Sequence, residues 1–266
     1  MGELLRQLRS VGELQRRLLP RAVPRPDGWR LAVHYAVGRW PGGDFYDFVA
    51  LPDGRLLLLL ADAGDRGAAA TALVAMVKVV VHACPLSSGA ERLPFCPVRD
   101  PVQQPPHILF GHLNRVLWEN SLEEQYLAAF GAVLEPIDGT FHYVNAGRPA
   151  PLWRRAPGPR RGGGAVEALR DAAGLPLGAD RRSSYHQRRI EIDRGDVLLF
   201  FSDGLVAAQD RGGRVFGCER LDDALREAGG DGAEAVKDAV LARLDDFLGG
   251  NKPFDDVTLL VVEREA

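Results

Sequence analysis

Four aspartates stand at the ends of predicted strands: Asp44, Asp62, Asp203 and Asp256. An ionised carboxylate at the mouth of a buried strand is costly unless it is paired or binds a cation. If several of them meet at one edge of a sheet, they repel one another, and a divalent cation relieves that repulsion. Oxygen ligands favour Mg²⁺ or Mn²⁺, and the lack of a neighbouring Cys or His set disfavours zinc. Each aspartate taken singly is also typical of a turn or a helix cap, so that interpretation stays open.

The elements that must position these residues follow from the pattern of apolar residues. The run Leu56–Leu60 is typical of a strand buried on both faces, and Ile137-Asp138-Gly139 predicts a hairpin turn. Strand blocks separated by helix blocks, with hairpins between neighbouring strands, indicate an α+β fold with antiparallel sheets. The predicted strands are 29–35, 44–50, 55–60, 127–134, 140–144, 185–192, 197–201 and 257–262, and the predicted helices are 1–19, 68–84, 108–122, 219–228 and 232–248.

The length of 266 residues and the hydrophobic content of 46% are sufficient for one large core. We expect residues 1–24 to form an N-terminal helix and linker, and residues 25–266 to form one domain. The leucine stripe of 1–19 either packs on that domain or docks a partner or a second copy. The proline-rich stretch 85–106 is predicted to be a long surface loop or lid.

The overall charge excludes some classes of function. The formal net charge is -3 and the pI is about 6.1, which predicts no bulk attraction to nucleic acid or anionic membranes. No uncharged apolar run reaches transmembrane length, and Glu3, Arg6 and Arg9 occupy the place of a signal peptide's apolar stretch. The 3 cysteines form no metal-binding or CxxC spacing. We therefore expect a reduced, cytoplasmic protein.

Segments from Leu14 to Val262 resemble, in the correct order, the motifs of PPM-type (metal-dependent) serine/threonine protein phosphatases of the bacterial SpoIIE/RsbU-like subgroup. The matching segments are Leu14–Pro20, Gly42-Gly43-Asp44-Phe45-Tyr46-Asp47, Asp62–Ala69, Asn145-Ala146-Gly147-Arg148-Pro149-Ala150-Pro151, Gly174–Gly178, Phe201-Ser202-Asp203-Gly204-Leu205 and Asp255-Asp256-Val257-Thr258.

The resemblance implies an αββα sandwich of two antiparallel sheets flanked by helices, with two Mn²⁺ or Mg²⁺ ions at one edge. By that likeness Asp62 bridges the two ions and the Ala63 carbonyl completes one site. Asp203 and Asp256 hold the second ion, and Asp44 binds directly or through water. A water activated by the metals would hydrolyse phosphoserine or phosphothreonine. The resemblance also suggests the substrate, an anti-sigma-factor antagonist in a partner-switching pathway.

Three residues depart from the family pattern: Asp65, Arg66 and Arg148. Either arginine is a candidate to bind substrate phosphate through its guanidinium, and pairing with Asp65 without a catalytic role is an equal alternative. The departures keep a second function open, a weak or inactive PPM-fold module that binds a phosphoprotein or a regulator. A regulator or a homodimer could use the N-terminal helix. A two-metal nuclease is disfavoured because the chain lacks a basic excess.

Overall fold

The computed structural model describes residues 11–38, 42–86, 105–122, 124–157, 165–228 and 232–266. The chain divides into two compact units. Unit 1 takes in Phe45–Arg148, Asp171–Glu191 and the helical segment 11–18, and unit 2 takes in Ala22–Asp44, Pro149–Arg170 and Ile192–Ala266. Each unit contains one sheet and its own hydrophobic cluster.

Unit 1 is built on a sheet with the strand order β2-β3-β4-β5-β8, and β9 also pairs with β5. Strand β3 pairs antiparallel with β4, and β4 pairs antiparallel with β5 through the predicted hairpin. The five leucines of β3 are all buried, as expected for a strand covered on both faces. The strands are β2 (Asp44–Ala50), β3 (Leu56–Ala63), β4 (Leu127–Glu135), β5 (Thr140–Ala146), β8 (Ala173–Gly174) and β9 (Arg188–Glu191).

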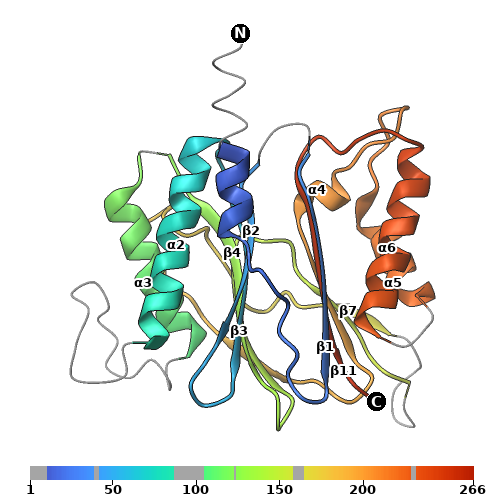
Figure 1. Cartoon of the computed structure of the whole chain (residues 1–266), viewed down its shortest axis with the longest axis horizontal. Helices are drawn as coiled ribbons and strands as arrows, with labels where there is room; N and C mark the ends of the chain where they lie inside the picture. The colour runs from blue at the N-terminus through green and yellow to red at the C-terminus, as the bar shows by residue number, and fades with distance from the viewer. Residues whose placement is uncertain (1–10, 39–41, 87–104, 123, 158–164, 229–231) are drawn as a thin grey trace. The chain divides into compact units, whose positions relative to one another are not determined.

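Two helices cover the sheet of unit 1, α2 (Ala68–Leu86) and α3 (Pro106–Asn120). Helix α2 contacts β3, and α3 contacts β4 and β5 (Figure 1). Phe110 of α3 is fully buried and meets the ring of Tyr185 edge-on, with 5.9 Å between ring centroids. The predicted helices 68–84 and 108–122 are therefore confirmed, with ends that differ by about two residues.

Unit 2 is built on a sheet with the order β1-β11-β10-β6-β7, so that β11 is flanked by β1 and β10. Helix α6 packs on β1 and β11, and α5 packs on β6 and β7 (Figure 1). The strands are β1 (Trp29–Ala36), β6 (Leu152–Arg154), β7 (Val166–Ala168), β10 (Val197–Phe201) and β11 (Val257–Arg264), and the helices are α4 (Asp203–Val206), α5 (Gly217–Glu227) and α6 (Ala233–Leu248).

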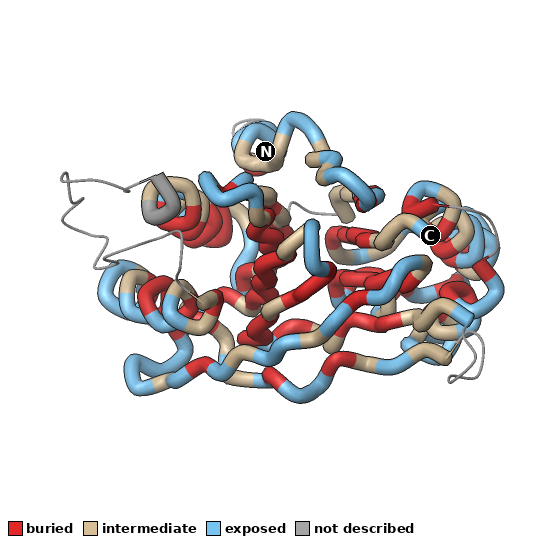
Figure 2. Tube along the Cα trace, turned by 90° about the horizontal axis from the view of Figure 1, so that it is seen from below, coloured by how far each residue is buried: buried red, intermediate tan, exposed pale blue. Residues whose placement is uncertain are grey.

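The burial pattern follows these two sheets. Figure 2 shows long buried stretches of the chain. Alternate residues of these stretches belong to the hydrophobic cluster of their own unit, such as Leu57 and Leu59 of β3 in unit 1 and Leu199 of β10 in unit 2. The predicted α+β fold with two mostly antiparallel sheets and flanking helices is confirmed, and the exception is β8, which pairs parallel with β5. The predicted strands 185–192 and 197–201 form, but in different sheets: β9 pairs with β5 in unit 1, whereas β10 pairs with β11 and β6 in unit 2.

The helical segment 11–18 is part of unit 1: Leu18 and the following Leu19 pack against the hydrophobic cluster of that unit, while Leu14 remains 50% exposed. Residues 1–10 of the predicted helix and 87–104 of the predicted lid lie outside the described residues, so the lid stays a prediction. The division of the chain at residue 24 stays a prediction as well. Among the helices of the described part, none is both long and apolar enough to cross a membrane.

Candidate functional site

In unit 1, the carboxylate of Asp62 lies at the end of β3 and pairs with a buried arginine. Asp62 is opposite Ala128 in the β3–β4 register, and a quarter of its side chain (24%) is exposed. The Arg148 Nη1 atom lies 3.2 Å from Asp62 Oδ2, and the Arg148 side chain is only 2% exposed. The predicted metal ligand and one predicted phosphate-binding residue therefore form an ion pair.

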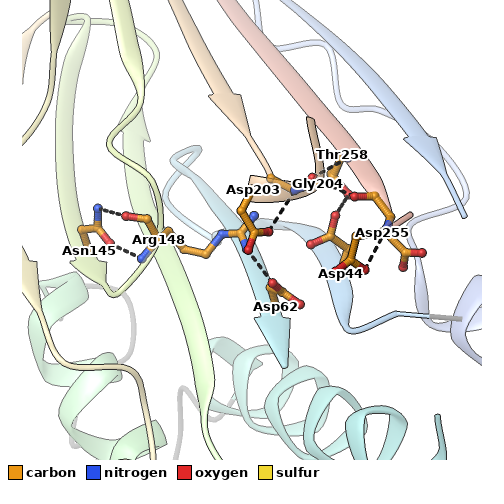
Figure 3. A network of polar contacts seen from close by, with 10 residues as sticks. Asp44, Asp62, Asn145, Arg148, Asp203, Gly204, Asp255 and Thr258 are labelled. Atoms are coloured by element: carbon orange, nitrogen blue, oxygen red, sulfur yellow. Dashed lines mark hydrogen bonds and ion pairs between the residues drawn. The ribbon is translucent and has the colours of Figure 1, made fainter. Parts of the chain in front are cut away.

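Asn145 explains why Arg148 reaches Asp62. Its side-chain Nδ2 donates to the Arg148 carbonyl at 3.0 Å, and the Arg148 N–H donates to Asn145 Oδ1 at 2.8 Å (Figure 3). These two buried bonds fold the chain tightly after β5, as Asx side chains do in turns. The backbone of Arg148 is thereby fixed beside the end of β3.

The other two departures from the family pattern lie on the loop between β3 and α2. Asp65 and Arg66 are both exposed. The Asp65 Oδ2 atom accepts a hydrogen bond from Gln125 Nε2 at 3.0 Å. Arg148 thus pairs with Asp62, while Asp65 is held by a neutral amide.

In unit 2, two of the predicted acids come together. A carboxylate oxygen of Asp44 and one of Asp203 lie within 4.8 Å of each other. Asp44 is buried, and its Oδ2 accepts a bond of 2.6 Å from the Thr258 hydroxyl (Figure 3). Asp203 is exposed at the start of α4 and accepts a bond of 3.1 Å from the Gly204 N–H. Like charges this close disfavour ionisation of both groups unless a cation is present, and hard oxygen donors fit Mg²⁺ or Mn²⁺.

Two glycines allow this arrangement because the backbone segments pass very close to one another. A Cβ atom at Gly204 would lie 2.0 Å from the Asp256 carbonyl oxygen, and one at Gly42 would lie 2.7 Å from Asp256 Oδ2. No side chain fits at either position without a shift of the backbone or of Asp256. Gly42, two residues before Asp44, and Gly204, directly after Asp203, therefore let the backbone beside those aspartates lie against residues 255–256.

Ser202 ties the strand end of β10 to the start of β11. Its hydroxyl donates to the Asp256 carbonyl at 3.1 Å and accepts from the Thr258 N–H at 2.9 Å, and its own N–H donates to the Thr258 carbonyl at 2.9 Å. The motifs in the sequence contain Ser202 and Thr258, but no role was predicted for either residue. A small hydroxyl residue close to an aspartate at the end of a buried strand was the feature that could have indicated such a role.

Asp256 is placed differently from Asp44 and Asp203. It is almost fully buried, and its two oxygens accept hydrogen bonds from the Tyr35 hydroxyl (3.2 Å) and the Gly38 N–H (3.0 Å). Burial raises the pKa of Asp256, although these hydrogen bonds oppose the rise. Among the described residues, the acids whose carboxylate oxygens lie close enough together to hold one cation do not include Asp256. Its ligand role stays a prediction.

Sequence reasoning missed a second charged cluster, formed by the last residue of the Gly42–Asp47 motif. Asp47 Oδ2 accepts from Lys78 Nζ at 2.8 Å and from His82 Nε2 at 2.7 Å. Both partners lie on α2, four residues apart and hence on one face of the helix. The four-residue spacing of these two basic residues is the sequence feature that could have predicted the cluster. The cluster fastens α2 to β2.

The fold is that of the PP2C class of protein phosphatases. The solved PP2C domain of SiaA from Pseudomonas aeruginosa superimposes with a TM-score of 0.76 at 16% identity, over 98% of this chain and 97% of that domain. Residues 52–265 match the sequence profile of the family called Stage II sporulation protein E (SpoIIE). The chain therefore belongs to the SpoIIE family of PPM-type phosphatases.

Two curated proteins are similar to the chain in sequence. Protein IcfG of Synechocystis is 23% identical over 97% of this chain, which spans only 41% of IcfG. The phosphoserine phosphatase RsbU of Bacillus subtilis is 22% identical over 99% of this chain and 71% of its own length.

Proposed function

We propose that the chain is a metal-dependent phosphoprotein phosphatase that hydrolyses phosphoserine or phosphothreonine. The single observation that carries the proposal is the pair of carboxylates of Asp44 and Asp203, within 4.8 Å of each other in unit 2. Membership of the SpoIIE family supports the reaction class, and the similarity to an enzyme named phosphoserine phosphatase supports the bond that is cleaved.

The proposed ligands of two Mn²⁺ or Mg²⁺ ions are the carboxylates of Asp44, Asp62, Asp203 and Asp256 with the carbonyl of Ala63. When bound, such ions supply a water of lowered pKa and neutralise charge on the phosphoryl oxygens. The Thr258 hydroxyl and the Gly204 N–H hold Asp44 and Asp203 in place. Acids that are oriented in advance lose less conformational entropy when they bind a cation.

Arg66 and Arg148 are the proposed phosphate-binding residues. A guanidinium presents a planar set of donors that matches phosphate oxygens. Arg66 lies exposed on the loop that precedes α2, where a phosphoprotein has access to it. Arg148 is buried and paired with Asp62, so it reaches a phosphate only on the side where Asp62 is exposed.

The proposed substrate is a phosphorylated anti-sigma-factor antagonist of a partner-switching pathway in the cytoplasm. The similarity to a relative named phosphoserine phosphatase supports a phosphoserine substrate, and the antagonist itself is suggested by the motif resemblance to the SpoIIE/RsbU-like subgroup. A regulator or a second copy would act through the N-terminal helix, where Leu14 is exposed beside the packed Leu18 and Leu19.

The test is hydrolysis of para-nitrophenyl phosphate and of a phosphoserine peptide with Mn²⁺, by the wild type and by the variant Asp62→Asn. Asp138→Asn, in the exposed turn between β4 and β5, is the matched control. We expect turnover that requires Mn²⁺, is lost in Asp62→Asn and is kept in Asp138→Asn. Calorimetric Mn²⁺ binding without turnover would instead favour the binding module, and neither binding nor turnover would refute the site.

A second comparison tests the ligand role of Asp256. Asp255 is its partly exposed neighbour, whereas Asp256 is buried and hydrogen-bonded to Tyr35 and Gly38. If Asp256 is a ligand, Asp256→Asn weakens Mn²⁺ binding in calorimetry more than Asp255→Asn does. If Asp256→Asn lowers only the melting temperature, Asp256 is a structural residue and leaves the ligand set.

A further inference from the structure

The proposed function requires Asp62 to bind metal cations, yet this carboxylate already has a cation of the protein beside it. Arg148 Nη1 lies 3.2 Å from Asp62 Oδ2. A guanidinium stays protonated at any physiological pH, so this positive charge is permanent. Any metal ion that binds Asp62 must displace the guanidinium or bind next to it.

The guanidinium is held in this place. The Arg148 backbone is fixed by two buried hydrogen bonds with Asn145. The Arg148 side chain is 2% exposed, while 24% of the Asp62 side chain faces solvent. An incoming ion therefore reaches the carboxylate from its open side, while the arginine remains covered by protein on the other.

The buried position makes the repulsion between the two cations large. Charges interact more strongly in the protein interior than in water because screening is weaker there. The arginine also takes up part of the negative charge that attracts the metal ion. Both effects act in the same direction and lower the affinity of Asp62 for a divalent cation.

We propose that Arg148 is a built-in competitor of the metal ion at Asp62, and that it sets the cation concentration at which the site is loaded. This inference rests on the proposed function. Arg148 acts through Asp62 and is therefore a positioning residue with respect to the metal. The arrangement makes activity conditional on the supply of Mn²⁺ or Mg²⁺.

The test is Mn²⁺ binding to the full chain, measured by titration calorimetry on the wild type, Arg148→Gln and Arg148→Lys. Glutamine keeps donors for Asp62 but removes the charge, and lysine keeps the charge. Removing a partner that supports a metal ligand lowers metal affinity by about 10–100-fold. Arg148 instead repels the metal ion, so we expect the opposite sign, with Arg148→Gln binding Mn²⁺ about tenfold more tightly. Arg148→Lys should bind Mn²⁺ less tightly than Arg148→Gln, because the positive charge is retained.

Thermal melting gives an independent measurement. Without Mn²⁺, Arg148→Gln should melt at a lower temperature than the wild type, because Asp62 has lost its ion pair. The rise in melting temperature on adding Mn²⁺ should then be larger in Arg148→Gln than in the wild type, as ligand linkage requires for tighter binding.

Equal or weaker Mn²⁺ binding by Arg148→Gln would overturn the proposal and make Arg148 an orienting residue for Asp62. If Arg148→Gln does not fold, Arg148→Met applies the same test with an uncharged side chain of similar length. Failure of the proposed function is distinguishable, because the wild type and Asp62→Asn would then bind Mn²⁺ equally. If binding depends on Asp62 but not on the charge at 148, only this inference fails.

Discussion

In unit 1, two of the acidic side chains, Asp47 and Asp62, face cations of the same unit. Asp47 accepts hydrogen bonds from Lys78 and His82, and Asp62 pairs with Arg148. The positive partners come from α2 and from the turn after β5. Folding of this unit therefore brings much of the balancing charge with it.

In unit 2, the acids at the strand ends are gathered instead. Asp44 and Asp203 lie within 4.8 Å of each other, and they accept hydrogen bonds from the neutral Thr258 hydroxyl and the neutral Gly204 N–H. Such donors fix the direction of a carboxylate without cancelling its charge. Because Asp44 and Asp203 lie close enough to repel each other, an added cation would relieve that repulsion.

Removal of an acid from unit 2 should have the largest effect. We expect Asp203→Asn to lower hydrolysis of para-nitrophenyl phosphate to the level of a control without enzyme. Its melting temperature without metal should not fall, because the repulsion with Asp44 is removed. Asp246→Asn, on the exposed side of α6, is the control. Activity retained in Asp203→Asn would show that hydrolysis does not depend on the paired acids of unit 2.

Truncation of a buried aromatic ring should destabilise each unit to a similar extent. Phe110 in unit 1 and Phe216 in unit 2 are fully buried, and each meets another aromatic ring edge-on. We expect Phe110→Ala and Phe216→Ala each to lower the free energy of unfolding by about 3–5 kcal/mol. Native-state hydrogen exchange is the measurement, since it reports β3 and β4 separately from β10 and β11. Equal loss of protection in both sheets for either variant would show that the units unfold together.

Asp47→Asn tests the charge balance of unit 1. The side chains of Lys78 and His82 are 25% and 41% exposed, so they can turn to water when the carboxylate is removed. We expect the free energy of unfolding in urea to fall by about 1.5–3 kcal/mol, the range for hydrogen bonds to a charged group. Asp53→Asn, which breaks an ion pair with Arg55 in an exposed turn, should cost less than about 1 kcal/mol. Equal losses of unfolding free energy in Asp47→Asn and Asp53→Asn would mean that burial of Asp47 does not strengthen its hydrogen bonds.

Asp210→Asn should have the smallest effect and a characteristic pH dependence. The side chain and N–H of Arg214, followed by the N–H of Gly212, lower the pKa of Asp210 below its ordinary value of 3.8. The ionised carboxylate therefore stabilises the fold above that value, and this contribution is lost as the pH falls through the lowered pKa. Wild type and variant should differ in urea unfolding at pH 7 and converge in acid. A constant difference at every pH would contradict the assignment.

Much of the fold was predictable because long helices and strands show a periodic pattern of apolar residues or a continuous apolar run. The five leucines of β3 and the Asp138-Gly139 turn each indicate their structure locally. The short elements β7, β8 and α4 escaped prediction because two to four residues cannot display a period. The separation of β9 and β10 into different sheets escaped it because pairing depends on partners far along the chain.

The candidate site was predictable as residue types and less so as contacts. Asp44 and Asp203 were identified from their places at strand ends, and the structure brings them together. The ion pair of Arg148 with Asp62 depends on how Asn145 folds the chain after β5, which spacing alone does not specify. The role of the Ser202 and Thr258 hydroxyls could not be predicted, because it depends on the pairing of β10 with β11.

The position of β11 has a consequence for how the protein is made. This strand lies between β1 and β10, yet it is synthesised after both. At about 5–20 residues per second, β1 leaves the ribosome tens of seconds before the strand that it must pair with exists. During that interval β1 lacks the strand that it pairs with. Once β10 is made it has β6 on one side but lacks β11 on the other, and strands with such unpaired edges invite aggregation. Production of this protein should therefore depend on chaperones that shield unit 2 until β11 emerges.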